Sequence, residues 1–216
     1  MKKAENIINE LKKEYGENNT FLVFNSPFEL TIAVMLSAQC TDVRVNQVTK
    51  EMFKVANTPE QFYKMDVSKI EEMIHSVGFY HNKAKNIKEC SRQIVEDFGG
   101  KVPNNMQDLM KLAGIGRKSA NVIMLEAFKD CQGIAVDTHV FRISKRLGLS
   151  NKNEPKEVEK DLLKIFPKKE WPFVNHSFIL HGRRVCKAIK PDCENCLISK
   201  YCNKRDSLSR WKTVIF

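Results

Sequence analysis

The chain has 216 residues, of which 42% are hydrophobic and 29% charged, with a net charge of +10 at pH 7. This composition is typical of a globular protein, and the length allows one domain or two small ones. No apolar run approaches the roughly 18–20 residues that span a membrane, and the N-terminal segment lacks the apolar core of a secretory signal. We therefore expect a cytoplasmic protein without a membrane partner. The positive charge is consistent with binding to a polyanion such as nucleic acid, and also with a merely well-solvated basic protein.

Helical periodicity runs through nearly the whole chain. Ile7, Leu11 and Tyr15 predict an opening helix that Gly16 ends. Capping signals then begin helices at 26–29, 58–61 and 68–71, the last of which we expect to end near Gly78. An apolar stripe predicts a longer helix over 84–98. Further helices are predicted over 105–111, from about residue 117 onward, and over 138–147, 154–165 and 171–185. The one candidate strand, 134–136, is too short to build a sheet, so the predicted fold class is all-α.

Residues 105–128 predict a helix, a tight turn and a second helix. Gly114 and Gly116 flank Ile115, which permits a sharp reversal and the close approach of another backbone. The first amide groups of the second helix suit a phosphate oxygen, which would make this a contact to the DNA backbone rather than to the bases. A plain corner between two helices is the alternative interpretation.

Two residues near this turn are candidates for covalent chemistry. Lys118 follows the turn by two residues, and a lysine amine can attack a sugar C1′ to form a Schiff base. Asp137, in the segment Ala135–His139, is a favoured N-cap for the helix after it. Its carboxylate could also stabilise positive charge on a sugar as a base departs. The sequence leaves both roles of Asp137 open, whereas a lysine in the first turn of a helix is usually solvated or a phosphate contact.

Four of the seven cysteines lie within one short stretch, whereas Cys40, Cys90 and Cys131 are isolated and expected to be buried. The four candidate metal ligands are Cys186, Cys193, Cys196 and Cys202. Their spacing fits a 4Fe–4S cluster better than a zinc ribbon, which usually has two C-x2-C pairs. Lys187 and Lys190 lie in the same loop and are candidate contacts to a DNA backbone, or solubilising charges.

Taken together, these motifs resemble the endonuclease III family of helix-hairpin-helix DNA glycosylases and abasic-site lyases. The strongest matches are Leu36–Gln39, Leu112–Lys118, Val136–His139, Leu180–Arg183 and the four-cysteine loop. Their order and spacing match together over residues 4 to 205.

The resemblance implies an all-α protein of two lobes. One would be a six-helix barrel over residues 21–133 that contains the hairpin, and the other would join residues 1–20 to 134–216 and hold a 4Fe–4S cluster. It implies a bacterial enzyme, monomeric and associated with the nucleoid, that removes oxidised pyrimidines from duplex DNA and cleaves the abasic site by β-elimination. Lys118 would be the nucleophile and Asp137 the essential carboxylate. Gln39 would fill the gap left by the flipped base, Phe79 would act as a wedge, and His139 would contact the backbone. Without the resemblance, Gln39 and Phe79 would be an ordinary helix-end residue and a core residue.

Three residues depart from the family pattern. Ala113 replaces the usual proline, which we expect to loosen the entry to the hairpin with little further effect. Phe79 replaces the usual leucine and could stack on bases, which would shift lesion or opposite-base preference. Cys40 stands where a small residue is common.

Three other functions compete with this one. An adenine-mismatch glycosylase is disfavoured because residues 30–36 contain no carboxylate and Lys118 is present. A thymine or uracil mismatch glycosylase fits the pair of Lys118 and Asp137 less well. A non-catalytic DNA-binding module would need neither residue.

Overall fold

The computed structural model describes residues 2–16 and 20–203. The described helices are α1 (Lys2–Tyr15), α2 (Pro27–Ser37), α3 (Asp42–Val55), α4 (Pro59–Lys64), α5 (Val67–Ile74), α6 (Tyr80–Phe98), α7 (Met106–Leu109), α8 (Arg117–Phe128), α9 (Thr138–Arg146), α10 (Pro155–Ile165) and α11 (Trp171–Arg184), with short 3-10 turns η1 (Lys168–Glu170) and η2 (Ser199–Tyr201). No strand occurs within these ranges, which confirms the all-α prediction. None of the described helices is long and apolar enough to cross a membrane.

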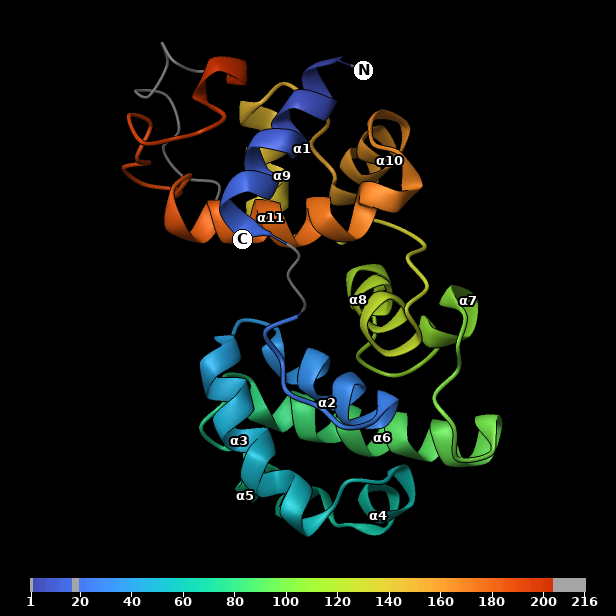
Figure 1. Ribbon diagram of the computed structural model, residues 1–216. Helices are drawn as coiled ribbons and strands as arrows, with labels where there is room; N and C mark the ends of the chain where they lie inside the picture. The colour runs from blue at the N-terminus through green and yellow to red at the C-terminus, as the bar shows by residue number, and fades with distance from the viewer. Residues whose placement is uncertain (1, 17–19, 204–216) are drawn as a thin grey trace. The chain divides into compact units, whose positions relative to one another are not determined.

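The described residues divide into two compact units, each with its own hydrophobic core (Figure 1). One unit spans residues 20–132 and contains α2 to α8. The other joins α1 to residues 133–203, which carry α9, α10 and α11. The chain therefore leaves the second unit after α1 and returns to it after α8.

The unit of residues 20–132 is built around α2. All residues of this helix from Phe28 to Leu36 are buried, and only Glu29 and Thr31 among them are polar, as expected for a core helix that is apolar on most of its surface. Ser26 caps it, because its Oγ accepts a hydrogen bond from the Glu29 amide at 3.1 Å, and Pro27 follows at the first helical position. Helices α3, α6 and α8 all pack against α2. As a result, α2 sets the positions of the helix ends that carry the candidate site residues of this unit.

The other unit is built around α11 in the same way. Val174, Phe178 and Leu180 are buried on it, and it packs against α1, α9 and η1. A hydrogen bond of 2.8 Å from Trp171 Nε1 to the Phe166 carbonyl fixes the start of α11 against the end of α10.

Two local predictions were wrong or incomplete. The start signal assigned to Ser68 is misplaced, because α5 begins at Val67 with Asp66 as its N-cap residue, and the helix ends at Ile74, short of Gly78. Helix α3 was not predicted at all. Its N-cap Thr41 and its buried residues Val45, Thr49 and Met52 follow the ordinary helical spacing, so the signal was present.

Candidate functional site

The predicted hairpin is present as α7, a turn and α8. Leu112 and Ile115 are buried and anchor the turn in the core. Gly114 has a φ of +77°, and a Cβ at this position would lie 3.1 Å from the Cβ of Asn86 and 3.2 Å from the sulfur of Met35. Gly114 therefore lets the turn pack directly against α6 and α2. Gly116, by contrast, is the N-cap residue of α8 and has an ordinary φ of −93°, and a Cβ there would meet no protein atom within 4 Å.

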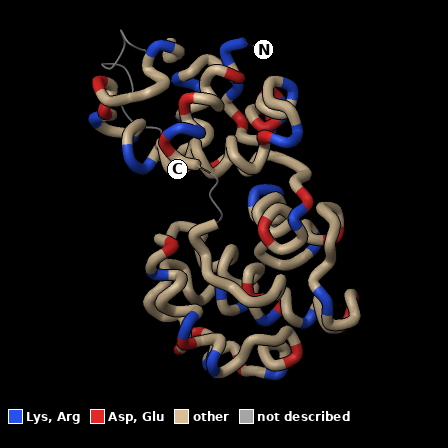
Figure 2. Tube along the Cα trace, viewed as in Figure 1, with Lys and Arg blue, Asp and Glu red and all other residues tan. Residues whose placement is uncertain are grey.

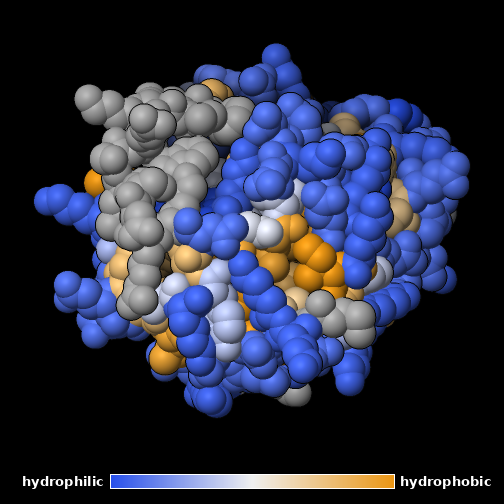
Figure 3. All heavy atoms as spheres, turned by 90° about the horizontal axis from the view of Figure 1, so that it is seen from above, coloured by the Kyte–Doolittle hydropathy of each residue, from blue (hydrophilic) through white to orange (hydrophobic). Residues whose placement is uncertain are grey.

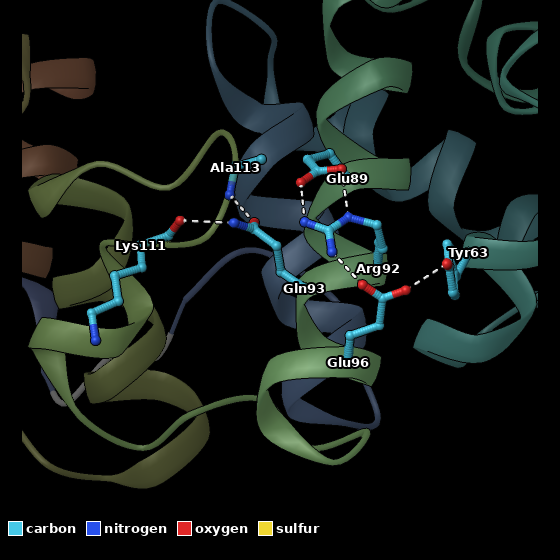
Figure 4. A network of polar contacts seen from close by, with 7 residues as sticks. All are labelled: Tyr63, Glu89, Arg92, Gln93, Glu96, Lys111 and Ala113. Atoms are coloured by element: carbon cyan, nitrogen blue, oxygen red, sulfur yellow. Dashed lines mark hydrogen bonds and ion pairs between the residues drawn. The ribbon is translucent and has the colours of Figure 1, made fainter.

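The side chain of Gln93 on α6 holds the entry to the hairpin on both sides (Figure 4). Its Oε1 accepts a hydrogen bond from the Ala113 amide at 2.7 Å, and its Nε2 donates to the Lys111 carbonyl at 3.2 Å. The Ala113 bond requires a backbone N–H, which proline lacks. The entry that we expected to be loosened by Ala113 is thus fixed by a hydrogen bond that a proline could not make.

Lys118 lies in the first turn of α8, and its side chain is exposed. The amide groups of this turn have no partners within their own helix, since the ladder of α8 begins with the Ala120 amide bonded to the Gly116 carbonyl at 2.9 Å. The structure therefore brings the candidate nucleophile, Gly116 and the positive end of the α8 dipole to one place on the surface of this unit.

Asp137 caps α9 in the other unit. Its Oδ1 accepts hydrogen bonds from the amides of His139 and Val140, both at 2.8 Å. The preceding segment is buried, and Asn175 on α11 fixes it by donating to the Ala135 carbonyl at 2.7 Å. The cap therefore occupies one carboxylate oxygen of Asp137 and orients the group.

His139, two residues later, is packed tightly against α11. A Cβ on Gly182 would lie 2.7 Å from its Nδ1, so only glycine allows this approach. Arg142 donates to the same Nδ1 at 3.0 Å and to the Gly182 carbonyl at 3.0 Å. Burial lowers the pKa of His139, and the Asp137 carboxylate opposes the shift. The ring is therefore neutral at physiological pH and is fixed beside Asp137.

The four-cysteine loop follows α11 and is held by arginine side chains from α9. Arg146 donates to Cys186 Sγ at 3.2 Å, and its carbonyl accepts from Cys202 Sγ at 3.2 Å. Arg142 donates to the Cys186 carbonyl at 3.0 Å. Burial raises the pKa of Cys196 to about 11, and the other three cysteines add to the shift, because the four thiols are near enough to interact electrostatically.

A buried histidine contacts the same loop. His181 on α11 is 1% exposed, and its Nε2 lies 3.3 Å from Cys196 Sγ. Its Nδ1 lies 3.0 Å from the hydroxyl oxygen of Tyr15 on α1. Burial lowers the pKa of His181 to about 4, so the ring is neutral. The sequence motif Leu180–Arg183 contains this histidine but does not indicate what it contacts. Nothing in the pattern identifies Tyr15 on α1 as its partner.

Gln39 and Phe79 are both exposed, although Phe79 is a large apolar residue with 64% of its surface accessible. Both have left-handed backbone conformations, with φ values of 54° and 60°. Such values are uncommon for residues other than glycine. Phe79 is therefore not the core residue that the sequence alone suggested.

Basic residues occur all along both units rather than in one tail (Figure 2). The face shown in Figure 3 is mostly hydrophilic, with a hydrophobic patch near its centre. Lys187 and Lys190 are exposed in the cysteine loop. The two lysines are therefore available to an external anion.

The chain is similar to known proteins over nearly its whole length. The model of the HhH-GPD superfamily of base excision DNA repair proteins matches residues 32–168. Endonuclease III of Synechocystis sp. is 44% identical over 200 residues, which are 93% of this chain and 91% of that protein. A trapped endonuclease III–DNA covalent intermediate matches with a TM-score of 0.88 and 43% identity over 93% of this chain and 95% of the other. A non-covalent endonuclease III–DNA complex matches with a TM-score of 0.89 and 43% identity over 94% of each chain.

Proposed function

The chain belongs to the endonuclease III family of helix-hairpin-helix base excision repair proteins, and we propose that Lys118 is the nucleophile of its reaction. Membership makes the protein a DNA glycosylase that also cleaves abasic sites, with DNA as its partner. The observation that carries the assignment of Lys118 is its exposed position in the first turn of α8, directly after Gly116 and Arg117. The covalent DNA complex of a 43% identical relative supports a nucleophile supplied by the protein.

The proposed reaction replaces the glycosidic bond at C1′ with a bond to the lysine, opens the sugar by breaking its C1′–O4′ bond, and then breaks the DNA strand. The neutral amine of Lys118 attacks C1′ of a flipped nucleotide, and the electron pair of the glycosidic bond leaves with the base. Ring opening gives a Schiff base between Nζ and C1′. Loss of a C2′ proton then expels the 3′ phosphate by β-elimination, and water releases the lysine.

Asp137 is the proposed partner of this lysine. Its Oδ1 caps α9, so we assign the chemistry at the sugar to the other carboxylate oxygen. A carboxylate at this point stabilises the positive charge that develops on the sugar as the base departs. The neutral His139 beside it is proposed to contact the DNA backbone.

We further propose that the substrates are oxidised or ring-saturated pyrimidines, such as thymine glycol, and abasic sites in duplex DNA. Gly114 shapes the hairpin that contacts the DNA backbone, Gly116 leaves room for that backbone at the start of α8, and Lys187 and Lys190 add contacts from the cysteine loop. Gln39 fills the gap left by the flipped base, and Phe79 enters the stack. The enzyme acts as a monomer in the cytoplasm.

The four cysteines are proposed to hold a 4Fe–4S cluster. Their spacing, with a single C-x2-C pair and unequal outer arms, favours this cluster over a zinc ribbon. The donor from Arg146 to Cys186 also suits thiolate sulfur. Bound there, the cluster would supply a rigid structural centre. We propose that residues 1–20 with 134–216 form the domain that holds it, and that residues 21–133 form a separate barrel domain.

The test is borohydride trapping on a duplex that contains one thymine glycol. We expect wild type to form a covalent complex and Lys118→Ala to form none, because the Schiff base needs the amine. Lys129→Ala is the matched control, since Lys129 is an exposed lysine at the other end of α8. It should trap like wild type.

Two results would contradict the proposal. Trapping by Lys118→Ala would assign the nucleophile elsewhere. Alkali-labile sites without trapping by wild type would show a glycosylase that uses water instead of the lysine.

A further inference from the structure

A lysine ammonium is buried in the unit of residues 20–132, at the end of its central helix. Lys83 on α6 is 6% exposed, and its Nζ donates to the carbonyls of Leu36 and Ala38 at 2.9 and 2.6 Å. These carbonyls belong to the last turn and the C-cap of α2. A helix C-terminus carries partial negative charge and orphan carbonyls, so a cation there is stabilised twice. Burial lowers the pKa of Lys83, which is the cost of this arrangement.

The carbonyls that Lys83 binds belong to the residues one and three positions before Gln39. After Ala38 the chain turns through the left-handed conformation of Gln39, and the Cys40 amide bonds back to the Ser37 carbonyl at 3.1 Å. The Lys83 ammonium therefore holds the backbone at the point where the chain leaves α2 and turns at Gln39.

Lys83 also lies one turn from Phe79. Its own amide donates to the Phe79 carbonyl at 3.1 Å, in the first turn of α6. Phe79 is the left-handed N-cap residue of that helix. The residue before Phe79 lies close to Gln39, since a Cβ on Gly78 would lie 3.9 Å from the Gln39 carbonyl oxygen. One buried side chain thus joins the two segments that present Gln39 and Phe79.

We propose that Lys83 is a positioning residue that fixes Gln39 and Phe79 as one rigid pair for insertion into the DNA duplex. This inference rests on the proposed function of that pair. Both residues have uncommon backbone conformations that the surrounding structure must impose. A pair already fixed before binding loses less conformational entropy when it replaces the flipped base. Lys83 touches neither substrate nor reacting atoms. Its replacement should therefore slow only those reactions that require Gln39 and Phe79 to enter the duplex.

The test compares two substrates in single-turnover reactions of Lys83→Met. On duplex DNA with thymine glycol opposite adenine, the base must be extruded and the gap filled. On a single strand with an abasic site, neither step is needed. We expect a loss of roughly 10- to 100-fold on the duplex, the size of effect that a small misplacement causes, and a change of less than about twofold on the single strand.

Lys88→Met is the matched control on the same helix. Lys88 donates to the Met65 carbonyl at 2.6 Å, at the C-cap of α4, so its replacement removes a similar lysine–carbonyl bond away from Gln39 and Phe79. It should slow both substrates equally. Lys83→Gln keeps an N–H donor on an uncharged side chain and should show a smaller substrate difference than Lys83→Met. It also serves as the test variant if Lys83→Met does not fold.

The outcomes separate this inference from the proposed function. If wild type forms no trapped complex with either DNA, the proposed function fails. If wild type is active and the Lys83 variants slow both substrates by the same factor, or match Lys88→Met, then Lys83 only stabilises the fold and the inference is wrong.

Discussion

Asp137 combines a structural and a proposed chemical role in a single carboxylate. Because both cap bonds are accepted by Oδ1, an asparagine at this position can keep them while it removes the charge. We expect Asp137→Asn to change the free energy of unfolding by less than about 0.5 kcal/mol. Release of a damaged base should fall by roughly 100-fold or more. Denaturant unfolding and single-turnover base release measure the two effects.

Asp137→Ala is the comparison for that variant. It removes the cap and the charge together, so it should lose activity and also about 1 kcal/mol of stability. If Asp137→Asn is as unstable as Asp137→Ala, the negative charge is needed for folding. If Asp137→Asn keeps its activity, the carboxylate is a cap and nothing more.

At the scale of elements, the two hairpin glycines make opposite predictions. Gly114→Ala places a methyl group against Asn86 and Met35 at a φ of +77°, and should cost about 1–3 kcal/mol of stability. Gly116→Ala meets no protein atom within 4 Å and should leave stability within about 0.5 kcal/mol. Its methyl group instead stands at the N-terminus of α8, where a phosphate is proposed to bind. We expect weaker DNA binding for Gly116→Ala, measured by fluorescence anisotropy beside thermal unfolding.

A stable Gly116→Ala variant with wild-type affinity would show that the hairpin does not bind the DNA backbone through this position. A Gly114→Ala variant with unchanged stability would mean that Asn86 and Met35 yield to the added methyl group. Either result would reassign the role of one glycine without affecting the other.

Helices could be predicted from the sequence because their signals are local. The caps at Ser26 and Thr58 lie next to the helices that they begin, and both are confirmed. Where two polar residues compete locally, as Asp66 and Ser68 do, the pattern predicted the wrong start. The position of such a boundary depends on how the rest of the unit packs against the helix, and the local sequence pattern does not contain that information.

Contacts between distant segments could not be predicted in the same way. Lys83 falls in the buried stripe of α6, with Ile87, Cys90 and Ile94, so the sequence could have flagged a lysine on an apolar face. Its partners at the end of α2 are 45 and 47 residues away, and only the packing of α6 on α2 brings them together. The bond from Ala113 to Gln93 depends equally on tertiary packing.

At the scale of the whole molecule, the net charge of +10 predicts salt-dependent DNA binding. Many of the lysines are already paired, for example Lys54 with Glu51 at 2.8 Å and Lys69 with Glu72 at 2.7 Å. Such pairs offset part of the positive charge locally, so the number of phosphates that the protein contacts is smaller than its count of basic residues. The slope of log affinity against log salt concentration measures that number, since each phosphate contact contributes about −0.9.

The slope also tests whether Lys187 and Lys190 contact DNA phosphates. If both contact phosphates, replacing them together with alanine should make the slope less steep by about 1.8, measured between roughly 50 and 200 mM salt. Lys54→Ala with Lys69→Ala is the control, because it removes the same charge from lysines paired on their own helices, and it should leave the slope nearly unchanged. Equal slopes for wild type and the Lys187 and Lys190 variant would show that the cysteine loop lies away from the DNA. In that case its role would be to hold the fold of its unit rather than to bind the backbone.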